Sequence, residues 1–452
     1  MGRSGPPMIP YGSTPVLLGL GPGNRGLDSS DGWREPGCYH PAPMAGSSDP
    51  ACLVDELTAD HPVGVDASSG WAASGAMALT GPADGLSRPA PAALVDGMWR
   101  LVDRYEALGG DPTDGPALLG ERAALAGMGR RGATSVGGHA RLMAARDGPV
   151  CVNLARPDDL AALPALLGED VDPPCWPTVE QIVRRCLSAE LVERADLLGM
   201  PLGAPGTGPG RPAVVTAGGS SLRRYDQVLV VELGSLWAAP LCGDLLRRAG
   251  CRVVKVESHT RPDGARRGLA AFFDLLNVGK ESVVVDTTTG VGRDALHRLV
   301  SSADVVVEAS RPRVMRQWGV DVDVLVESGT VWTSITGYGR TGPRSSGVAF
   351  GDDAAISGGL FLEDPLGFVA DAVADPATGL LAAVLTLAAL KSGRGHLLDV
   401  SLAGTARWLT GDGRMVDVSD GVEVARPRAR NADAPAREMG VDTASVMAGL
   451  LT

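Results

Sequence analysis

The sequence predicts an α/β protein built on a parallel sheet, and three observations lead to this prediction. Between residues 226 and 405, short apolar runs of strand length alternate with segments of helical spacing. Glycine-containing breaks separate these runs, as at Gly234–Pro240 and Gly250. Residues 50–200 instead show mainly helical apolar spacing. We therefore expect a Rossmann-like large domain together with a smaller, mainly helical α+β domain.

The order of elements in the large domain follows from these patterns. Strand–helix–strand units form right-handed crossovers, which make the strands of one sheet parallel and cover both of its faces. The expected strands are 228–233, 252–257, 282–286, 304–308 and 331–336, and the expected helices are 241–249, 291–302, 313–318 and 377–391.

The remaining segments complete the predicted organisation of the chain. Helices are expected at 92–108, 112–128, 157–167 and 179–198, and a short closing helix at 443–451. The expected regions are a flexible N-terminus at 1–48, the small domain at 49–200, a Gly/Pro linker at 201–225, the large domain at 226–410 and a C-terminal tail at 411–452 that returns to the large domain.

Composition narrows the possible partners and the compartment. The net charge of −12 argues against general binding to nucleic acid or to an anionic membrane surface. The seven cysteines are scattered without a Cys-x-x-Cys pair, which is typical of a reducing compartment, and no metal-ligand spacing is present. We find no signal peptide and no apolar run long enough to span a membrane, so a cytoplasmic protein without a metal is expected.

A weak internal repeat relates the two halves of the chain. Residues 74–82 can be aligned with 357–365, and each segment precedes a helical stretch that ends in an Ala-Leu pair. The position equivalent to Asp352 in the front copy is Ser68 or Ser69, so the repeat predicts a degenerate first copy. Asp66, a few residues away, is the nearest candidate for a replacement carboxylate.

The segment from 226 to about 450 resembles the class III CoA-transferase family, which includes formyl-CoA and carnitine CoA-transferases and, more distantly, 2-methylacyl-CoA racemases. No single motif carries the resemblance, but many occur in the family's order. They are residues 239–242, 250–257, 277–282, 285–286, 303–308, 311–312, 337–343, 374–379, 393–402 and 434–443. Residues 50–200 look like the family's small domain, moved to the front of the chain.

The resemblance implies an acyl-CoA and a carboxylic acid as substrates, in lipid or carboxylic-acid metabolism, and a homodimer. It also implies a nucleophilic aspartate on the loop after Gly337–Pro343, here Asp352 or its neighbour Asp353, the choice between them remaining open. The nearby Gly358 and Gly359 are candidates for backbone donors to an oxyanion. By themselves, the two acids also suit a solvated turn or a helix N-cap.

Candidate CoA-binding residues come from two sources. Basic side chains follow the ends of strands, where parallel sheets usually present ligands, and arginine binds phosphate through two hydrogen bonds. After the second strand these residues are Lys255, His259, Arg261, Arg266 and Arg267, and the further candidates are Lys280, Arg311, Arg313 and Arg316. The motifs of the resemblance add Ala239, Pro240, Gly337 and Tyr338.

The residues named above are compatible with three functions. A CoA-transferase working through an aspartyl anhydride and an aspartyl-CoA thioester is favoured. A racemase is an alternative, although the racemases place a histidine immediately before the loop aspartate and this chain has Gly351 there. Asp375 occupies the family's other acidic position. A non-catalytic CoA-binding paralogue is the third possibility, consistent with a degenerate first copy.

Overall fold

The computed structural model describes residues 47–59, 67–171, 175–220, 228–418 and 422–450. The predicted flexible N-terminus therefore lies almost entirely outside the described residues, as does Asp66.

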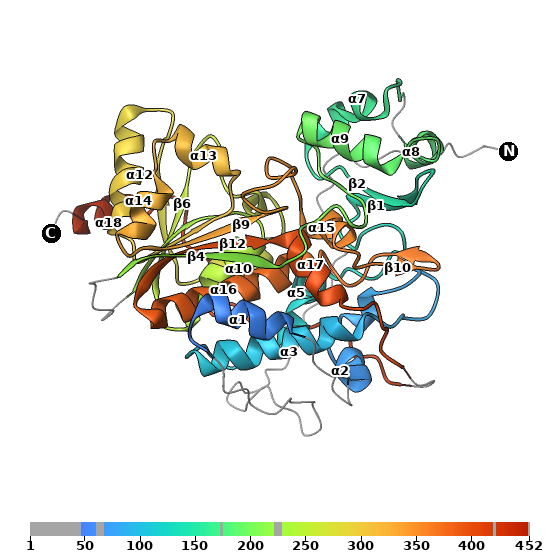
Figure 1. The fold of residues 1–452 in the computed structure, drawn as a ribbon, viewed down its shortest axis with the longest axis horizontal. Coiled ribbons are helices and arrows are strands. Elements are labelled where there is room, and N and C mark those ends of the chain that lie inside the picture. The colour runs from blue at the N-terminus through green and yellow to red at the C-terminus, as the bar shows by residue number, and fades with distance from the viewer. Residues whose placement is uncertain (1–46, 60–66, 172–174, 221–227, 419–421, 451–452) are drawn as a thin grey trace, which may run out of the picture.

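A seven-stranded sheet forms the centre of the molecule, in the order β4-β12-β9-β8-β5-β6-β7 (Figure 1). All neighbouring strands are parallel except β4, which pairs antiparallel with β12 at one edge. The α/β prediction with a mostly parallel sheet is thus confirmed. The strands are β4 (Ala213–Ser220), β5 (Leu229–Leu233), β6 (Arg252–Glu257), β7 (Glu281–Val284), β8 (Val305–Glu308), β9 (Val331–Thr336) and β12 (Arg394–Ser401).

Helices cover both faces of this sheet, because the buried strands are apolar on both sides (Figure 1). Val230 packs into the core under α10 (Ala238–Arg248), whereas its neighbour Val231 packs into the core under α12 (Gly290–Ser302). The second face also carries α13 (Pro312–Gln317), α14 (Val322–Glu327) and α18 (Thr443–Gly449), and α11 (Ala270–Asn277) packs beside α10.

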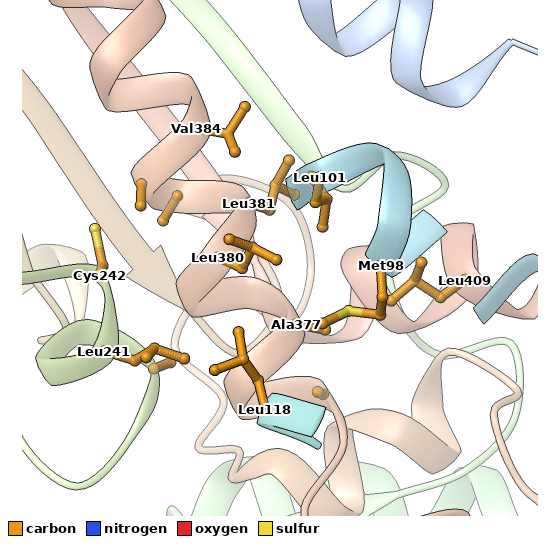
Figure 2. Packing of buried hydrophobic residues seen from close by; sticks show 14 of the residues in the cluster. Met98, Leu101, Leu118, Leu241, Cys242, Ala377, Leu380, Leu381, Val384 and Leu409 are labelled. Atoms are coloured by element: carbon orange, nitrogen blue, oxygen red, sulfur yellow. The ribbon is translucent and has the colours of Figure 1, made fainter. Parts of the chain in front are cut away.

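The long helix α16 (Ala374–Ser392) runs through the first of these cores. Figure 2 shows its residues Leu380, Leu381 and Val384 among side chains from α10 and from α3 (Ala92–Ala107). By length and composition α16 is apolar enough to cross a membrane, but 83% of its apolar window is buried inside this protein. Its apolar character is therefore accounted for by its place in the core.

The front half of the chain divides between two cores, unlike the single small domain expected at 49–200. Its first helices share the core of α16, whereas residues from 140 onward build a separate core on a three-stranded antiparallel sheet. The shared part comprises α1 (Pro50–Thr58), α2 (Ala67–Ala73), η1 (Met77–Leu79), α3, α4 (Gly115–Leu118) and α5 (Glu121–Ala126). The separate part comprises β1 (Ala140–Ala144), β2 (Pro149–Asn153), β3 (Leu202–Gly203), α6 (Pro157–Ala161), α7 (Leu163–Leu167), α8 (Trp176–Val183) and α9 (Ser188–Leu198).

The segment 201–225, expected to be a linker, contains two strands. β3 completes the small sheet by pairing with β2, and β4 adds an edge to the large one. These strands are stabilised by backbone hydrogen bonds to distant partners, so the glycine- and proline-rich local sequence did not indicate them.

The site region and the tail complete the fold. α15 (Gly351–Ser357) lies between β2 and α17 (Leu402–Thr410), followed by a hairpin of β10 (Leu362–Glu363) and β11 (Leu366–Gly367). The segments of the proposed repeat differ locally: 74–82 contains η1, whereas 357–365 contains the end of α15 and β10. The tail reaches β7, where the backbone N–H of Ser282 donates to Asp442.

Candidate active site

Four aspartates gather where the front and back halves of the chain meet. Asp352 and Asp353 lie in the first turn of α15, Asp375 lies in the first turn of α16, and Asp371 precedes α16. A helix begins at Gly351 where a loop was expected, which places both acids of the predicted pair at a helix N-terminus. Carboxylates are favourable there because the first backbone N–H groups have no partner within the helix.

Asp353 is a buried carboxylate of this cluster whose hydrogen bonds link elements of the fold. Its side chain is 0% exposed. Its Oδ1 accepts hydrogen bonds from the backbone N–H of Phe350 at 3.1 Å and from Asn153 Nδ2 at 2.8 Å. It thus caps its own helix and joins α15 to β2. Burial raises the pKa of Asp353 to about 7, and the negative charge of Asp352 raises it further, whereas the hydrogen bonds from Asn153 and Phe350 lower it. A fully buried carboxylate cannot contact a substrate, so Asp353 is unsuited to be the nucleophile.

Asp352 and Asp375 form the accessible part of the cluster. Asp352 is 9% exposed and Asp375 is partly exposed. The backbone N–H of Gly351 donates to Asp375 Oδ2 at 3.1 Å, which holds the two side chains at neighbouring helix ends. Burial raises the pKa of Asp352 to about 6 and of Asp375 to about 7, and each pKa is lowered by the positive charge of Arg122. One carboxylate of this pair can therefore be ionised near neutral pH.

Arg122, on α5 of the front half, is the cation of the cluster. Its Nε donates to Asp371 Oδ2 at 2.9 Å, and its Nη2 donates to the other carboxylate oxygen of Asp371. Its guanidinium carbon lies 5.1 Å from the centroid of the Trp237 ring. Asp371 is fully buried, so this two-pronged ion pair joins the front half to the loop before α16.

The loop that carries Asp371 has an unusual backbone. Ala370 and Ala372 both adopt positive φ, at 54° and 45°, a conformation that costs free energy for any residue with a Cβ. The N–H of Ala370 donates to Thr80 Oγ1 at 2.9 Å. Contacts with the front half therefore hold Asp371 in a conformation that the local sequence does not favour, as is common at functional sites.

Gly358 and Gly359 lie at the opposite end of α15 from the carboxylates. A Cβ at Gly358 would meet the backbone of Arg407 at 2.5 Å, so this glycine allows α15 to pack closely against α17. Their role as oxyanion donors stays a prediction, which this placement does not support.

Several predicted CoA-binding residues are engaged elsewhere. Lys255 and Lys280 are 2% exposed, and both bind Glu232, with Lys255 also binding Asp263. They support the sheet from within, because a buried cation needs buried anions. Arg266 pairs with Glu257 and stacks on Phe273.

The residues predicted from motifs are also mainly structural. Ala239 and Pro240 are buried in the first turn of α10. Gly337 accepts backbone and side-chain hydrogen bonds from Ala403 and Ser401. Tyr338 is buried, donates to the carbonyl of Leu202 at 3.1 Å and carries the Arg344 guanidinium on its ring. In this conformation none of these four presents a side chain to a ligand.

A second group of predicted cations does remain together at the surface. Burial lowers the pKa of Arg311, and the nearby charges of Arg313, Arg156 and Arg261 lower it further. Among the described residues, Arg261, Arg311 and Arg313 have no carboxylate partner. Arg156 lies 5.8 Å from the Phe350 ring, so this arginine cluster adjoins the start of α15. Arg267 and Arg316 are exposed and outside these contacts.

The residues that sequence reasoning missed come mostly from the front half. They are Arg122, Ser135, Asn153 and Asp371, with His139 close to Arg122. The Ser135 side chain hydrogen-bonds Asp352 and lowers its pKa. No local pattern marks these residues, because each becomes relevant only through a contact with a residue 200 or more positions away in the chain.

Comparisons with known proteins agree with the family expectation. Residues 225–439 match the model of CoA-transferase family III, so this segment is similar to that family. Succinyl-CoA–D-citramalate CoA-transferase of Chloroflexus aurantiacus is 30% identical over 198 residues, 40% of this chain and 49% of the relative. Succinate–glutarate CoA-transferase of Agrobacterium fabrum is 31% identical over 199 residues, 39% of this chain and 50% of the relative.

Among solved structures, a CaiB/BaiF family protein from Brucella suis has 28% sequence identity and a TM-score of 0.40, covering 44% of this chain and 60% of that one. The chain spans about half the length of the curated relatives it matches. The front half, which supplies Arg122 and Asn153, lies outside the segment matched by the family model.

Proposed function

We propose that the protein transfers CoA from an acyl-CoA to a carboxylic acid through an aspartyl intermediate. The observation that carries the proposal is a pair of carboxylates, the partly exposed Asp375 and the nearly buried Asp352, next to the N–H of Gly351 in the segment that matches the CoA-transferase family III model. Asp375 is the more exposed of the two, and we assign it as the nucleophile. This moves the reacting atom from the Asp352–Asp353 pair, between which the sequence left the choice open, to Asp375.

The proposed reaction uses only a carboxylate and the energy of the thioester. An oxygen of Asp375 attacks the acyl carbonyl, forming a mixed anhydride and releasing the CoA thiolate. The thiolate attacks the aspartyl carbonyl, which gives an aspartyl-CoA thioester and releases the donor acid. The acceptor acid then attacks this thioester, which forms a second mixed anhydride with Asp375 and releases the CoA thiolate again. The thiolate attacks the acceptor carbonyl of this anhydride, which gives the new acyl-CoA and restores the Asp375 carboxylate.

The arginine cluster supports the binding of CoA. Arg261, Arg311 and Arg313, which have no carboxylate partner among the described residues, suit the phosphates of a nucleotide. Arg156, which lies over the Phe350 ring, joins them to the start of α15. Arg261 and Arg311 follow β6 and β8, whose carboxyl ends lie on the same edge of the parallel sheet. Of the predicted CoA-binding residues, Arg261, Arg311 and Arg313 keep that role in the proposal, and Arg156, which also pairs with Asp159, is added.

The proposal is tested by trapping the intermediate. The protein is incubated with succinyl-CoA as a probe and with hydroxylamine, and its peptides are analysed by mass spectrometry. A hydroxamate at Asp375 that is lost in Asp375→Asn and kept in Asp353→Asn is the expected result. A hydroxamate at Asp352 would move the nucleophile back to the position favoured by the sequence.

Two other results would overturn the assignment of a transferase. Exchange of the α-hydrogen of a 2-methylacyl-CoA with deuterated solvent, in the absence of an acceptor acid, would indicate a racemase instead. Binding of CoA without a trapped intermediate, and without transfer to any acid in a panel of mono- and dicarboxylates, would indicate a CoA-binding protein that has no transferase activity.

A further inference from the structure

Arg122 is a cation next to three carboxylates of the site, Asp352, Asp371 and Asp375, and it comes from the half of the chain outside the family match. It holds Asp371 through two hydrogen bonds, and its charge acts on both Asp352 and Asp375. The question is whether this contact only joins two parts of the fold or also controls the carboxylate pair.

The surroundings of Arg122 restrict its position. The Trp237 ring lies against its guanidinium, and the preceding residue Glu121 is fixed by Arg430, whose Nε and Nη2 donate to it at 2.7 and 2.9 Å. Arg430 also binds Asp244 at 2.8 Å. The tail and α10 thus anchor α5, so that Arg122 extends from a fixed helix and has little freedom to leave the cluster.

The charges that face this position come from every neighbouring element. Asp352 and Asp353 are on α15, Asp371 is on the strained loop and Asp375 is on α16. On the other side, His139 and Arg131 precede β1. Arg122 hydrogen-bonds Asp371 directly, and its positive charge also acts on Asp352 and Asp375.

We propose that Arg122 is a positioning residue that keeps the Asp352–Asp375 pair available as an ionised nucleophile and fixes Asp371 behind it. The front half of the chain then supplies the electrostatic part of the site within the same polypeptide. This inference rests on the proposed function, since it assigns Arg122 a role in that same acyl transfer. The physical reason is that an opposite charge near a buried carboxylate favours its ionised form.

The first test measures the rate of CoA transfer as a function of pH for the wild type, Arg122→Gln and Arg122→Lys. With the positive charge removed, the acid limb of kcat should move to higher pH by roughly one unit, and kcat at pH 7 should fall about tenfold, with a smaller change in KM. Arg122→Lys should restore the position of the limb while part of the loss in kcat persists, because lysine cannot reproduce the two-pronged contact.

Two further variants separate this role from simple stabilisation. Arg130→Gln removes an arginine from the same segment that binds only backbone carbonyls, of Pro82, Ala78 and Gly85, and it should leave the acid limb in place. Asp371→Asn removes a negative charge from behind the pair and should move the limb to lower pH. The opposite shifts of Arg122→Gln and Asp371→Asn are not expected from loss of stability.

A readout without turnover keeps this inference distinct from the proposed function. Modification of Asp375 by a water-soluble carbodiimide, followed by peptide mass spectrometry across the pH range, reports the ionisation of this carboxyl directly. Its midpoint should rise in Arg122→Gln whether or not the protein transfers CoA. An unchanged midpoint in folded Arg122→Gln, or equal shifts in Arg122→Gln and Arg130→Gln, would overturn the assignment, and a failure of trapping alone would overturn only the transferase.

Discussion

Asn153 and Asp353 are 200 residues apart in the chain, yet the Asn153 side chain donates to the Asp353 carboxylate at 2.8 Å inside the protein. The second carboxylate oxygen of Asp353 has no hydrogen-bond partner among the described residues. A buried oxygen of this kind carries a desolvation cost when it is charged. The contact therefore joins the two halves through a residue that favours its protonated form.

A stability prediction follows from Asp353. The pKa in the folded protein, about 7, lies above the ordinary value of 3.8, so the folded state holds a proton that the unfolded chain has released between these pH values. The free energy of unfolding contributed by this group therefore falls as pH rises from about 4 to 7. Asp353→Asn should raise the free energy of unfolding at pH 8 by on the order of 1–3 kcal/mol, and with it the melting temperature. At pH 4 the substitution should have little effect.

Thermal unfolding at the two pH values measures this difference. The exposed Asp158 in the first turn of α6 is the matched control, and Asp158→Asn should change stability only slightly. Equal or greater destabilisation of Asp353→Asn at pH 8 would contradict the reasoning, and would point to the Asn153 contact as favourable in its ionised form.

Gly351 is predicted to be required for activity because a side chain at this position would collide with its neighbours, and not because its φ angle demands glycine. A Cβ at this position would lie 2.3 Å from the carbonyl oxygen of Ala372 and 2.6 Å from Asp375 Oδ2. Gly351→Ala should displace Asp375 and lower kcat by at least about tenfold. Gly290, whose Cβ would meet nothing within 4 Å, is the control, and Gly290→Ala should retain the wild-type rate. Full activity of Gly351→Ala would show that the site adjusts without cost.

The arginine cluster predicts a charge-dependent affinity for CoA. Arg311→Ala should raise the KM for the acyl-CoA about tenfold, because a charge-assisted contact to phosphate contributes about 1.5–3 kcal/mol. The same effect should weaken in high salt. Arg298→Ala, an exposed arginine on α12, serves as the control. Steady-state kinetics at two salt concentrations decide this point, and an unchanged KM in Arg311→Ala would remove the cluster from the binding site.

The core around α16 predicts a large loss of stability on truncation. Leu380 is 0% exposed and packs near Leu241 (Figure 2). Leu380→Ala should lower the free energy of unfolding by about 2–5 kcal/mol, through the lost transfer energy and the cavity that remains. Val291, 79% exposed on α12, gives the comparison, and Val291→Ala should change stability by less than about 0.5 kcal/mol. Chemical denaturation measures both, and similar values for the two would contradict the assigned core.

The sequence by itself determined the parallel sheet and the resemblance of residues 225–439 to CoA-transferase family III. Strands such as 252–257 and 331–336 coincide with β6 and β9, because a short apolar run between turn residues is a local signal. The motifs from 225 onward were recognisable for the same reason, since their order in the chain does not depend on contacts.

Only the tertiary structure decided which residues surround the carboxylates. The strands β3 and β4 exist through pairing with β2 and β12, and Lys255 is removed from the surface by Glu232. Asp375, and not Asp353, has access to solvent, although both lie in the first turn of a helix. Burial and the pairing of charges depend on atoms that are close in space but distant in sequence. The sequence therefore did not indicate Arg122 as a site residue, and only the folded structure shows its contact with Asp371.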